Sequence, residues 1–306
     1  MPRSYDLGVM KHIAVLTSVV LWAASFTAIR AGLAGYSFTH LVLLRFGLAS
    51  VAFSVVWLFR GRPLPAVKDL PAIFGAGVIA AALYPLLLSF GEATVPSGTA
   101  SLLVSLSPIF TALLAAAALS ERLTAPGWLG VGVCFAGVVL ISSTQQRGGA
   151  GLGTAAVLMA AALQGVQFVV SRSALRRMHP IDFTIFIIWA GTIVDLPLAR
   201  GLAGAFARAP LPATLSILYL GLLSSTVAMM TWSYALQHLT APRAAAFLYL
   251  VPPVTLVVSW IWLGEVPQVT TLIGGAITVG GVVVVQRFGR ATMAPVPIAL
   301  AARRGS

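Results

Sequence analysis

The stretch LSPIFTALLAAAALSERL (Leu106–Leu123) returns, loosely rewritten, as LVPPVTLVVSWIWLGEVP (Leu250–Pro267), 144 residues later. Apolar composition explains shared leucines, but it does not explain a proline, a threonine, a glutamate and two glycines that keep register without a gap. The stretch therefore indicates an internal duplication. The matched positions are Leu106/Leu250, Pro108/Pro252, Thr111/Thr255, Leu119/Leu263, Glu121/Glu265, Gly130/Gly274 and Gly137/Gly281.

The composition places the chain in a membrane. Of 306 residues, 59% are hydrophobic and only 8% are charged, whereas a soluble domain has about 25% charged residues. Runs of about twenty apolar residues span the hydrocarbon core of a bilayer. The net charge of +12 does not indicate nucleic-acid binding, because the basic residues lie in short connections between apolar runs, where they orient a membrane protein.

Ten apolar runs can be drawn along the chain. Helices are expected rather than strands, because the runs lack alternation and a helix satisfies its own backbone in lipid. The first run is expected to remain as a span rather than to be cleaved, because residues 14–33 resemble residues 156–175 of the second half. The expected spans are 12–30, 41–59, 70–90, 97–118, 126–143, 152–171, 181–199, 213–236, 243–263 and 268–286.

The distribution of Lys and Arg predicts the orientation. Arg30, Arg147, Arg200 and Arg208 fall on the side opposite the N-terminus and Arg45 falls within a span, so the other fourteen of nineteen lie on the N-terminal side. The positive-inside rule then predicts that both termini are cytoplasmic.

Each half holds five spans, an odd number, so the second half must cross the membrane upside down. We expect an all-α polytopic membrane protein of ten transmembrane helices arranged as two inverted five-helix repeats, 12–143 and 152–286, with a cytoplasmic tail at 287–306. Inverted repeats are typical of secondary transporters, which bind substrate near the midplane and use alternating access.

With these motifs the chain resembles the EamA-type exporters of the drug/metabolite transporter superfamily over residues 12–286. The resemblance rests on Pro108, Glu121, Gly130 and Gly137 and their counterparts Pro252, Glu265, Gly274 and Gly281, with Trp22 and Arg45 also fitting the family pattern. Within the superfamily the chain is most similar to the aromatic amino-acid exporters of bacterial inner membranes. The resemblance implies a transporter of amino acids, other metabolites or drugs, placed in the bacterial inner membrane.

Four prolines are candidate helix hinges: Pro85, Pro108, Pro252 and Pro253. Proline removes a backbone hydrogen bond and kinks a helix, and Pro108 and Pro252 are expected in the middle of equivalent spans. A static kink for packing and a moving gate are both compatible with this pattern, because membrane bundles tolerate helix breakers.

Charged residues within spans are candidate functional groups. Asp195 is expected about two thirds of the way across its span and is a candidate for proton coupling, although it could also pair with Arg200 or reach the outer interface. Arg45 could hold a substrate carboxylate or extend to the outer interface. Glu121 and Glu265 are expected at helix ends, where a capping or anchoring role is favoured.

The resemblance places a substrate cavity among spans one, three, four, six, eight and nine. Aromatic walls with a few hydrogen-bonding groups suit a zwitterion with an apolar side chain, although each aromatic side chain could also serve ordinary packing. The candidate cavity residues are Trp22, Ser25, Tyr84, Ser101, Ser105, Gln164, Gln167, Ser224, Tyr234 and Tyr249.

The sequence predicts a small-molecule exporter whose partners are its substrate and the lipid bilayer. No cofactor or metal is expected and no nucleic acid, and the glycines of spans five and ten fit packing within a monomer or a homodimer. Export of a drug or another metabolite is the alternative. A membrane enzyme and a channel are disfavoured, because the histidines are scattered at span ends and because inverted repeats suit a carrier.

Overall fold

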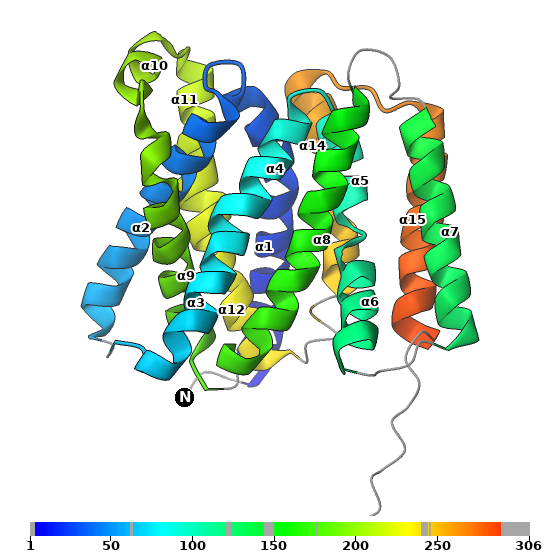
Figure 1. Cartoon of the computed structure of the whole chain (residues 1–306), viewed down its shortest axis with the longest axis horizontal. Helices are drawn as coiled ribbons and strands as arrows, with labels where there is room; N and C mark the ends of the chain where they lie inside the picture. Colours follow the sequence, from blue (N-terminus) through cyan, green and yellow to red (C-terminus); the bar gives the residue numbers. More distant parts are fainter. Residues whose placement is uncertain are drawn as a thin grey trace, which may run out of the picture.

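The computed structural model of the chain is a bundle of upright helices (Figure 1). The structure describes residues 4–61, 64–119, 124–143, 150–175, 177–239, 244 and 246–288, and no strand occurs among them. The described helices are α1 Ser4–Gly32, α2 Phe38–Arg60, η1 Val67–Asp69, α3 Leu70–Gly77, η2 Val78–Leu83, α4 Tyr84–Glu92, α5 Ser97–Val104, α6 Ser107–Leu119, α7 Ala125–Ser143, α8 Ala150–Leu175, α9 Pro180–Asp195, η3 Leu196–Ala199, α10 Leu202–Arg208, α11 Leu211–Leu218, η4 Tyr219–Val227, α12 Ala228–His238, η5 Leu248–Leu250, α14 Val251–Leu263 and α15 Val269–Phe288.

Eight stretches among the described residues are long and apolar enough to cross a membrane. Two shorter apolar helical stretches, Ala125–Ile141 and Leu248–Leu263, coincide with the expected spans 126–143 and 243–263. The expected all-helical, polytopic membrane protein is therefore confirmed, while ten spanning helices remain a prediction. Residues 289–306, most of the expected tail, lie outside the described residues.

The outer surface of the bundle is apolar, as lipid contact requires. Leu129, Val139 and Ile261 are among the large hydrophobic side chains that are more than 60% exposed. Helix α1 begins, and α15 ends, at the lower end of the bundle in Figure 1. We call this end the terminal end and the opposite one the far end.

Helices α7 and α15 pack antiparallel through pairs of glycines. A Cβ atom on Gly130 would lie 2.9 Å from the carbonyl oxygen of Gly281, and one on Gly281 would lie 2.7 Å from that of Gly130. Gly137 and Gly274 meet in the same way at 2.6 and 2.8 Å. The 144-residue offset converts Gly130 into Gly274 and Gly137 into Gly281, so it exchanges the two contacts.

Other residues contact their own counterparts in the second half of the chain. Cys134 donates a hydrogen bond to the carbonyl oxygen of Thr278 at 3.3 Å, 144 residues away. The hydroxyls of Ser50 on α2 and Thr192 on α9 are 2.8 Å apart and 142 residues apart in sequence. The π-helical segments η2 and η4 also occupy corresponding places, within the third and eighth expected spans.

The prolines lie within the apolar helical stretches, and each adjoins an irregular turn, whereas their role as hinges stays a prediction. The fourth span is divided between α5 and α6, so Pro108 falls in the first turn of α6. Pro252 and Pro253 lie in the first turn of α14 after the short helix η5. Pro85 is the second residue of α4 and lies inside the continuous helical stretch Val67–Glu92, directly after the wide turns of η2. The first turns of α6 and α14 tolerate proline, because their N–H groups have no partner within the helix.

Candidate functional site

An arginine in the interior of the bundle is the centre of the candidate site. Arg45 on α2 donates from Nε to the Ser225 hydroxyl at 2.8 Å and from Nη2 to the Ser224 hydroxyl at 3.4 Å. Both serines are almost fully buried. Arg45 therefore points inward and does not extend to the interface. The sequence left two roles open for Arg45, and the inward position agrees with a carboxylate contact rather than with extension to the interface. The carboxylate contact itself stays a prediction.

The π-helical segment η4 brings these serines to Arg45. A Cβ atom on Gly221 would lie 3.0 Å from the Arg45 carbonyl oxygen, so only glycine permits this approach of η4 to α2. Thr226 donates to the Gly221 carbonyl oxygen, five residues earlier, at 2.9 Å. A wide turn of this kind is rare and frequently occurs at functional sites.

Aromatic side chains adjoin the arginine through Ser224. Trp22 on α1 donates from Nε1 to the Ser224 carbonyl oxygen at 3.2 Å. Its ring lies 5.2 Å from that of Trp232, centroid to centroid, and Tyr219 donates to the Leu21 carbonyl oxygen at 2.9 Å. A guanidinium beside half-buried aromatic rings suits a ligand that has a carboxylate and an apolar side chain.

The far end of the bundle is closed by an ion pair between segments distant in sequence. Arg30, in the last turn of α1, lies 3.1 Å through Nε from Glu265 Oε1. Arg30 also donates from Nη1 to the carbonyl oxygens of Glu92 and Val95. Glu265 accepts from the Ser97 N–H at 3.0 Å. These contacts join α1, the α4–α5 connection and the segment after α14.

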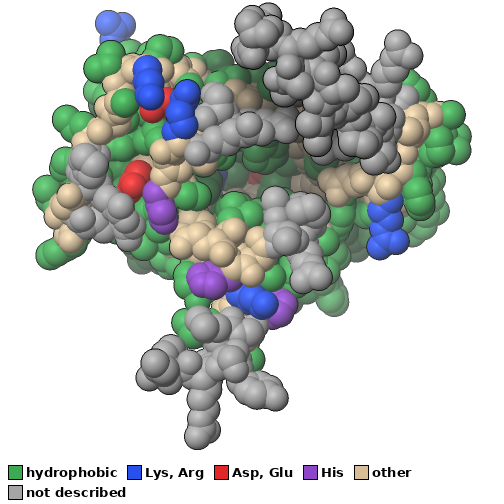
Figure 2. All heavy atoms as spheres, turned by 90° about the horizontal axis from the view of Figure 1, so that it is seen from below, with side chains coloured by type: hydrophobic (Ala, Val, Ile, Leu, Met, Phe, Trp, Pro, Cys, Tyr) green, Lys and Arg blue, Asp and Glu red, His purple; other side chains and the backbone are tan. Residues whose placement is uncertain are grey.

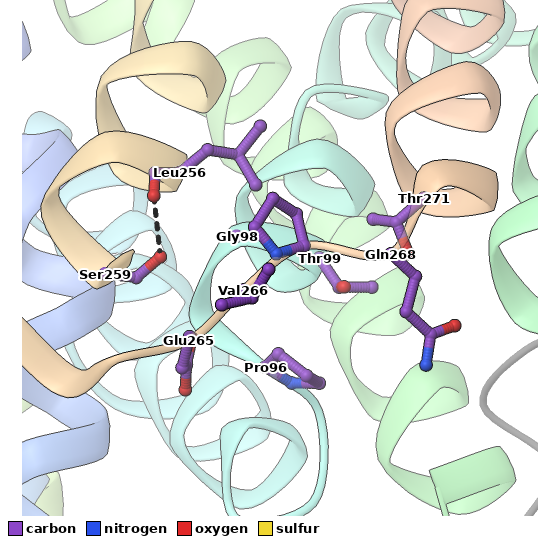
Figure 3. Close-up of a pocket in the computed structure, with 10 residues that line it drawn as sticks. Pro96, Gly98, Thr99, Leu256, Ser259, Glu265, Val266, Gln268 and Thr271 are labelled. Carbon is purple, nitrogen blue, oxygen red and sulfur yellow. Dashed lines mark hydrogen bonds between the residues drawn. The ribbon is translucent and has the colours of Figure 1, made fainter. Parts of the chain in front are cut away.

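Local structure explains why Glu265 reaches α5. Gly264 ends α14 at φ 69°, a left-handed conformation that glycine adopts readily. The turn carries Glu265 to the N-terminus of α5, where a carboxylate is favourable. Figure 3 shows Glu265 beside Pro96, in a pocket of about 90 Å³ between α5, α14 and the start of α15. The expected capping role of Glu265 is thus confirmed, and an ion pair accompanies it. Glu121, its counterpart, lies outside the described residues.

Glu92 is the most deeply buried acid in the described part of the chain. It ends α4, it is 0% exposed, and neither of its carboxylate oxygens has a hydrogen-bond partner. The charged groups that act on it electrostatically are Glu265, Arg30 and Arg45. Glu92 is the last residue of the helical stretch Val67–Glu92, and it is a buried acid that the sequence analysis did not single out.

Asp195 stands apart from this group. It is the last residue of α9, it is 1% exposed, and its Oδ2 has no hydrogen-bond partner. It forms no ion pair with Arg200, so the pairing considered for it was wrong. Asp195 forms no hydrogen bond or ion pair with Arg30, Arg45 or Glu92.

The polar groups of several predicted cavity residues form hydrogen bonds within or between helices. The hydroxyls of Ser25, Ser101 and Ser105 donate to carbonyl oxygens of their own helical stretch. Gln164 accepts from the Ser107 hydroxyl at 2.6 Å, and Gln167 donates to Ser171. The bond from Ser107 joins Gln164 on α8 to α6, and a cavity role for the other residues stays a prediction.

The predicted tyrosines fall in three different places. Tyr84 lies within electrostatic range of Arg45 and Glu92, so it belongs to the candidate site. Tyr234 stacks on His238 near the terminal end, with ring centroids 4.3 Å apart. Tyr249 lies on η5, and its hydroxyl is buried without a partner.

The terminal end is hollowed where the far end is closed. Figure 2, which looks at the terminal end, shows a hollow between the helices, with Lys, Arg and His side chains around the rim of the face. The terminal end thus has a hollow (Figure 2), and the Arg30–Glu265 ion pair joins segments at the far end.

Sequence reasoning missed the group formed by Arg30, Glu92 and Glu265. Arg30 was placed at the end of the expected span 12–30 and Glu92 in the connection after the expected span 70–90, whereas each belongs to the last turn of a helix. A usable signal was present: the first and third spans end on the same side of the membrane, and each ends in a charge of opposite sign.

Comparisons with known proteins agree with this architecture. The model of the EamA-like transporter family matches residues 9–143 and 151–287, once in each half. A protein of Streptantibioticus cattleyicolor described as a probable terminal-alkyne amino-acid exporter is 40% identical over 93% of this chain and 96% of its own. The uncharacterized transporter YdfC of Bacillus subtilis is 39% identical over 86% of each chain.

A solved crystal structure has the same fold. It matches 90% of this chain and 95% of its own with a TM-score of 0.58 at 20% identity, a likeness that concerns the fold alone. The family model covers both halves, and the relatives named as transporters align over most of their length. This multi-pass membrane protein therefore belongs to the EamA-like transporter family.

Proposed function

We propose that the protein is a secondary transporter that exports neutral or aromatic amino acids, or closely related metabolites, across the bacterial inner membrane. The observation that carries the proposal is Arg45, an interior guanidinium whose hydrogen-bond acceptors among the described residues are two serine hydroxyls. A cation in that position needs an anionic partner or function to offset its burial. The carboxylate of an amino acid supplies that anion. The relative described as an amino-acid exporter supports the same substrate class.

Alternating access between two inverted repeats is the proposed mechanism. The exchange of glycine contacts between α7 and α15 under the 144-residue offset supports it, because a two-fold relation between antiparallel helices has this effect. Contacts between counterparts, Ser50 with Thr192 and Cys134 with Thr278, support it further. Two related halves allow two packings of similar energy, one open to each side.

We further propose that the hollow terminal end faces the cytoplasm. The arginine and lysine residues concentrate on that side of the chain, and cytoplasmic connections carry an excess of positive charge. In this orientation the structure is open to the cytoplasm, and the Arg30–Glu265 pair closes the external end.

Uptake into proteoliposomes of purified protein tests the function. We expect saturable uptake and counterflow of labelled phenylalanine, with the same initial rate in the presence and absence of a pH gradient. The variant Arg45→Gln removes the guanidinium and is expected to raise the phenylalanine concentration needed for half-maximal uptake about 10- to 100-fold. Arg208→Gln, a change on the short helix α10, is expected to leave uptake unchanged. Uptake of a cationic drug but of no amino acid would refute the proposal.

A further inference from the structure

The interior charges near the far end form two pairs that differ in one respect. Arg30 and Glu265 are in direct contact at 3.1 Å. Arg45 and Glu92 act on one another electrostatically, yet they form neither a hydrogen bond nor an ion pair within 4.0 Å. Arg30 and Glu265 therefore form an ion pair, whereas the side chains of Arg45 and Glu92 do not.

No described residue donates a hydrogen bond to the Glu92 carboxylate. Its carboxylate oxygens are fully buried and unpartnered, and a buried charge is costly unless it is paired. Arg30 does not contact this carboxylate, because its Nε pairs with Glu265 and its Nη1 donates to backbone carbonyl oxygens. Ser89, one turn earlier on α4, is also buried with an unpartnered hydroxyl.

Arg45 has donors to spare. A guanidinium carries five N–H donors in a planar fork that matches a carboxylate. The described part of the chain offers it only the two hydroxyls of Ser224 and Ser225. The ring of Phe46 lies 5.1 Å from its central carbon and offers no anion.

We propose that Arg45 and Glu92 bind the two ends of one zwitterionic substrate. The Arg45 guanidinium holds the substrate carboxylate, and the Glu92 carboxylate accepts the N–H groups of its ammonium. This inference rests on the proposed function and narrows its substrate class to free α-amino acids. A zwitterion satisfies both unpaired charges at once, whereas an amine leaves Arg45 unpaired and a carboxylic acid leaves Glu92 unpaired.

The closed far end lies next to this site. Arg30 donates to the carbonyl oxygen of Glu92 itself, so the residue that accepts the ammonium also belongs to the closure. The charged and titratable groups around Glu92 are Arg30 from α1, Arg45 from α2, Tyr84 from α4 and Glu265 after α14. A substrate ammonium bound there is shielded from the far side by the Arg30–Glu265 pair.

Competition by substrate analogues tests the assignment. Proteoliposomes are loaded with unlabelled phenylalanine, and counterflow of labelled phenylalanine is inhibited by phenylalanine, by its decarboxylated amine or by its deaminated acid. In the wild type we expect each analogue to compete about 10- to 100-fold more weakly than phenylalanine, the loss of one charge-assisted hydrogen bond.

The variants then separate the two ends. Glu92→Gln is expected to weaken the binding of phenylalanine and of the amine by that factor and to leave the binding of the deaminated acid unchanged. Arg45→Gln is expected to weaken the binding of phenylalanine and of the deaminated acid and to leave the binding of the amine unchanged. Asp195→Asn, an equal change at another buried carboxylate, is expected to leave all three competitors unchanged.

Three results would overturn the inference. The first is a wild type that does not distinguish phenylalanine from its deaminated acid, a test that needs no variant to fold. The second is a Glu92→Gln protein that weakens all three competitors equally. The third is a Glu92→Gln protein that loses only a response to a pH gradient, because Glu92 then carries a proton. Phenylalanine transport with any of these results leaves the proposed function intact, whereas absence of amino-acid transport in the wild type refutes both.

Discussion

Replacement of Glu265 by glutamine should loosen the far end of the bundle. Glu265 has two roles there: it pairs with Arg30 at 3.1 Å, and it accepts the Ser97 N–H at 3.0 Å. Glutamine has nearly the same shape and retains one acceptor oxygen. The change therefore removes the charge while the turn set by Gly264 remains.

The magnitude follows from these two contacts. The side chains of Arg30 and Glu265 are 32% and 18% exposed, so solvent screens the pair and it contributes up to about 1 kcal/mol. A hydrogen bond to a charged acceptor contributes about 1.5–3 kcal/mol, of which a neutral amide oxygen retains roughly half. The closed far end should lose about 1–2 kcal/mol, which is roughly a 5- to 30-fold rise in the open population.

Cysteine accessibility measures this population. Cys134, which is fully buried, is replaced by alanine, and Ser97→Cys places a single thiol at a fully buried position beside Glu265. A membrane-impermeant maleimide is then added to intact cells. When closing is fast compared with labelling, the labelling rate is proportional to the open population, so Glu265→Gln should raise the rate about 5- to 30-fold.

A double-mutant cycle identifies the pair as the cause. Arg30→Gln should also raise the labelling rate, and the double variant should label no faster than the faster single variant, because both changes break one interaction. An unchanged rate in Glu265→Gln refutes the closure. Faster labelling in inverted vesicles, but not in intact cells, refutes the proposed orientation.

Three further predictions concern packing and the remaining acid. Gly281→Ala should destabilise the purified protein by about 1–3 kcal/mol and lower its Tm, because the added Cβ meets backbone atoms of α7 at 2.7 and 2.8 Å, whereas Gly280→Ala, with nothing within 4 Å, should leave the Tm unchanged or raise it. The double variant Pro108→Ala and Pro252→Ala should retain phenylalanine counterflow, because first-turn prolines displace no helical hydrogen bond; loss of counterflow in folded protein would restore them as hinges. Asp195→Asn should transport at the wild-type rate with and without a pH gradient, and loss of a gradient response would make Asp195 the coupling group.

The existence of the helices was predictable because membrane embedding constrains the backbone so strongly. Apolar runs of sufficient length must be helical in lipid, and all ten expected runs overlap described helices by most of their length. Position along a run was harder to predict. Pro108 lies near the middle of an apolar run, but whether a proline kinks one helix or begins another depends on the preceding turn, which here ends at Val104.

Glu92 was missed for a related reason. A glutamate followed by a proline within four residues reads as a connection, because proline disfavours helix in the residue before it. The helix in fact continues to Glu92, and the turn starts only afterward. The cations nearby, Arg30 and Arg45, are distant from Glu92 in sequence, so no local pattern around Glu92 reveals this group of charges.

The repeat that organises the fold cannot identify the binding residues, and the reason is physical. In the proposed alternating access, residues shared by both halves are those that both packings need, such as the glycines that let α7 and α15 approach. A single asymmetric substrate binds once, so its partners are not duplicated. The 142-residue offset that pairs Ser50 with Thr192 places Ile187 opposite Arg45. A charge present in one half and absent from the other is therefore the more informative pattern for substrate binding. Residues matched between the halves instead indicate the scaffold that moves in the proposed mechanism.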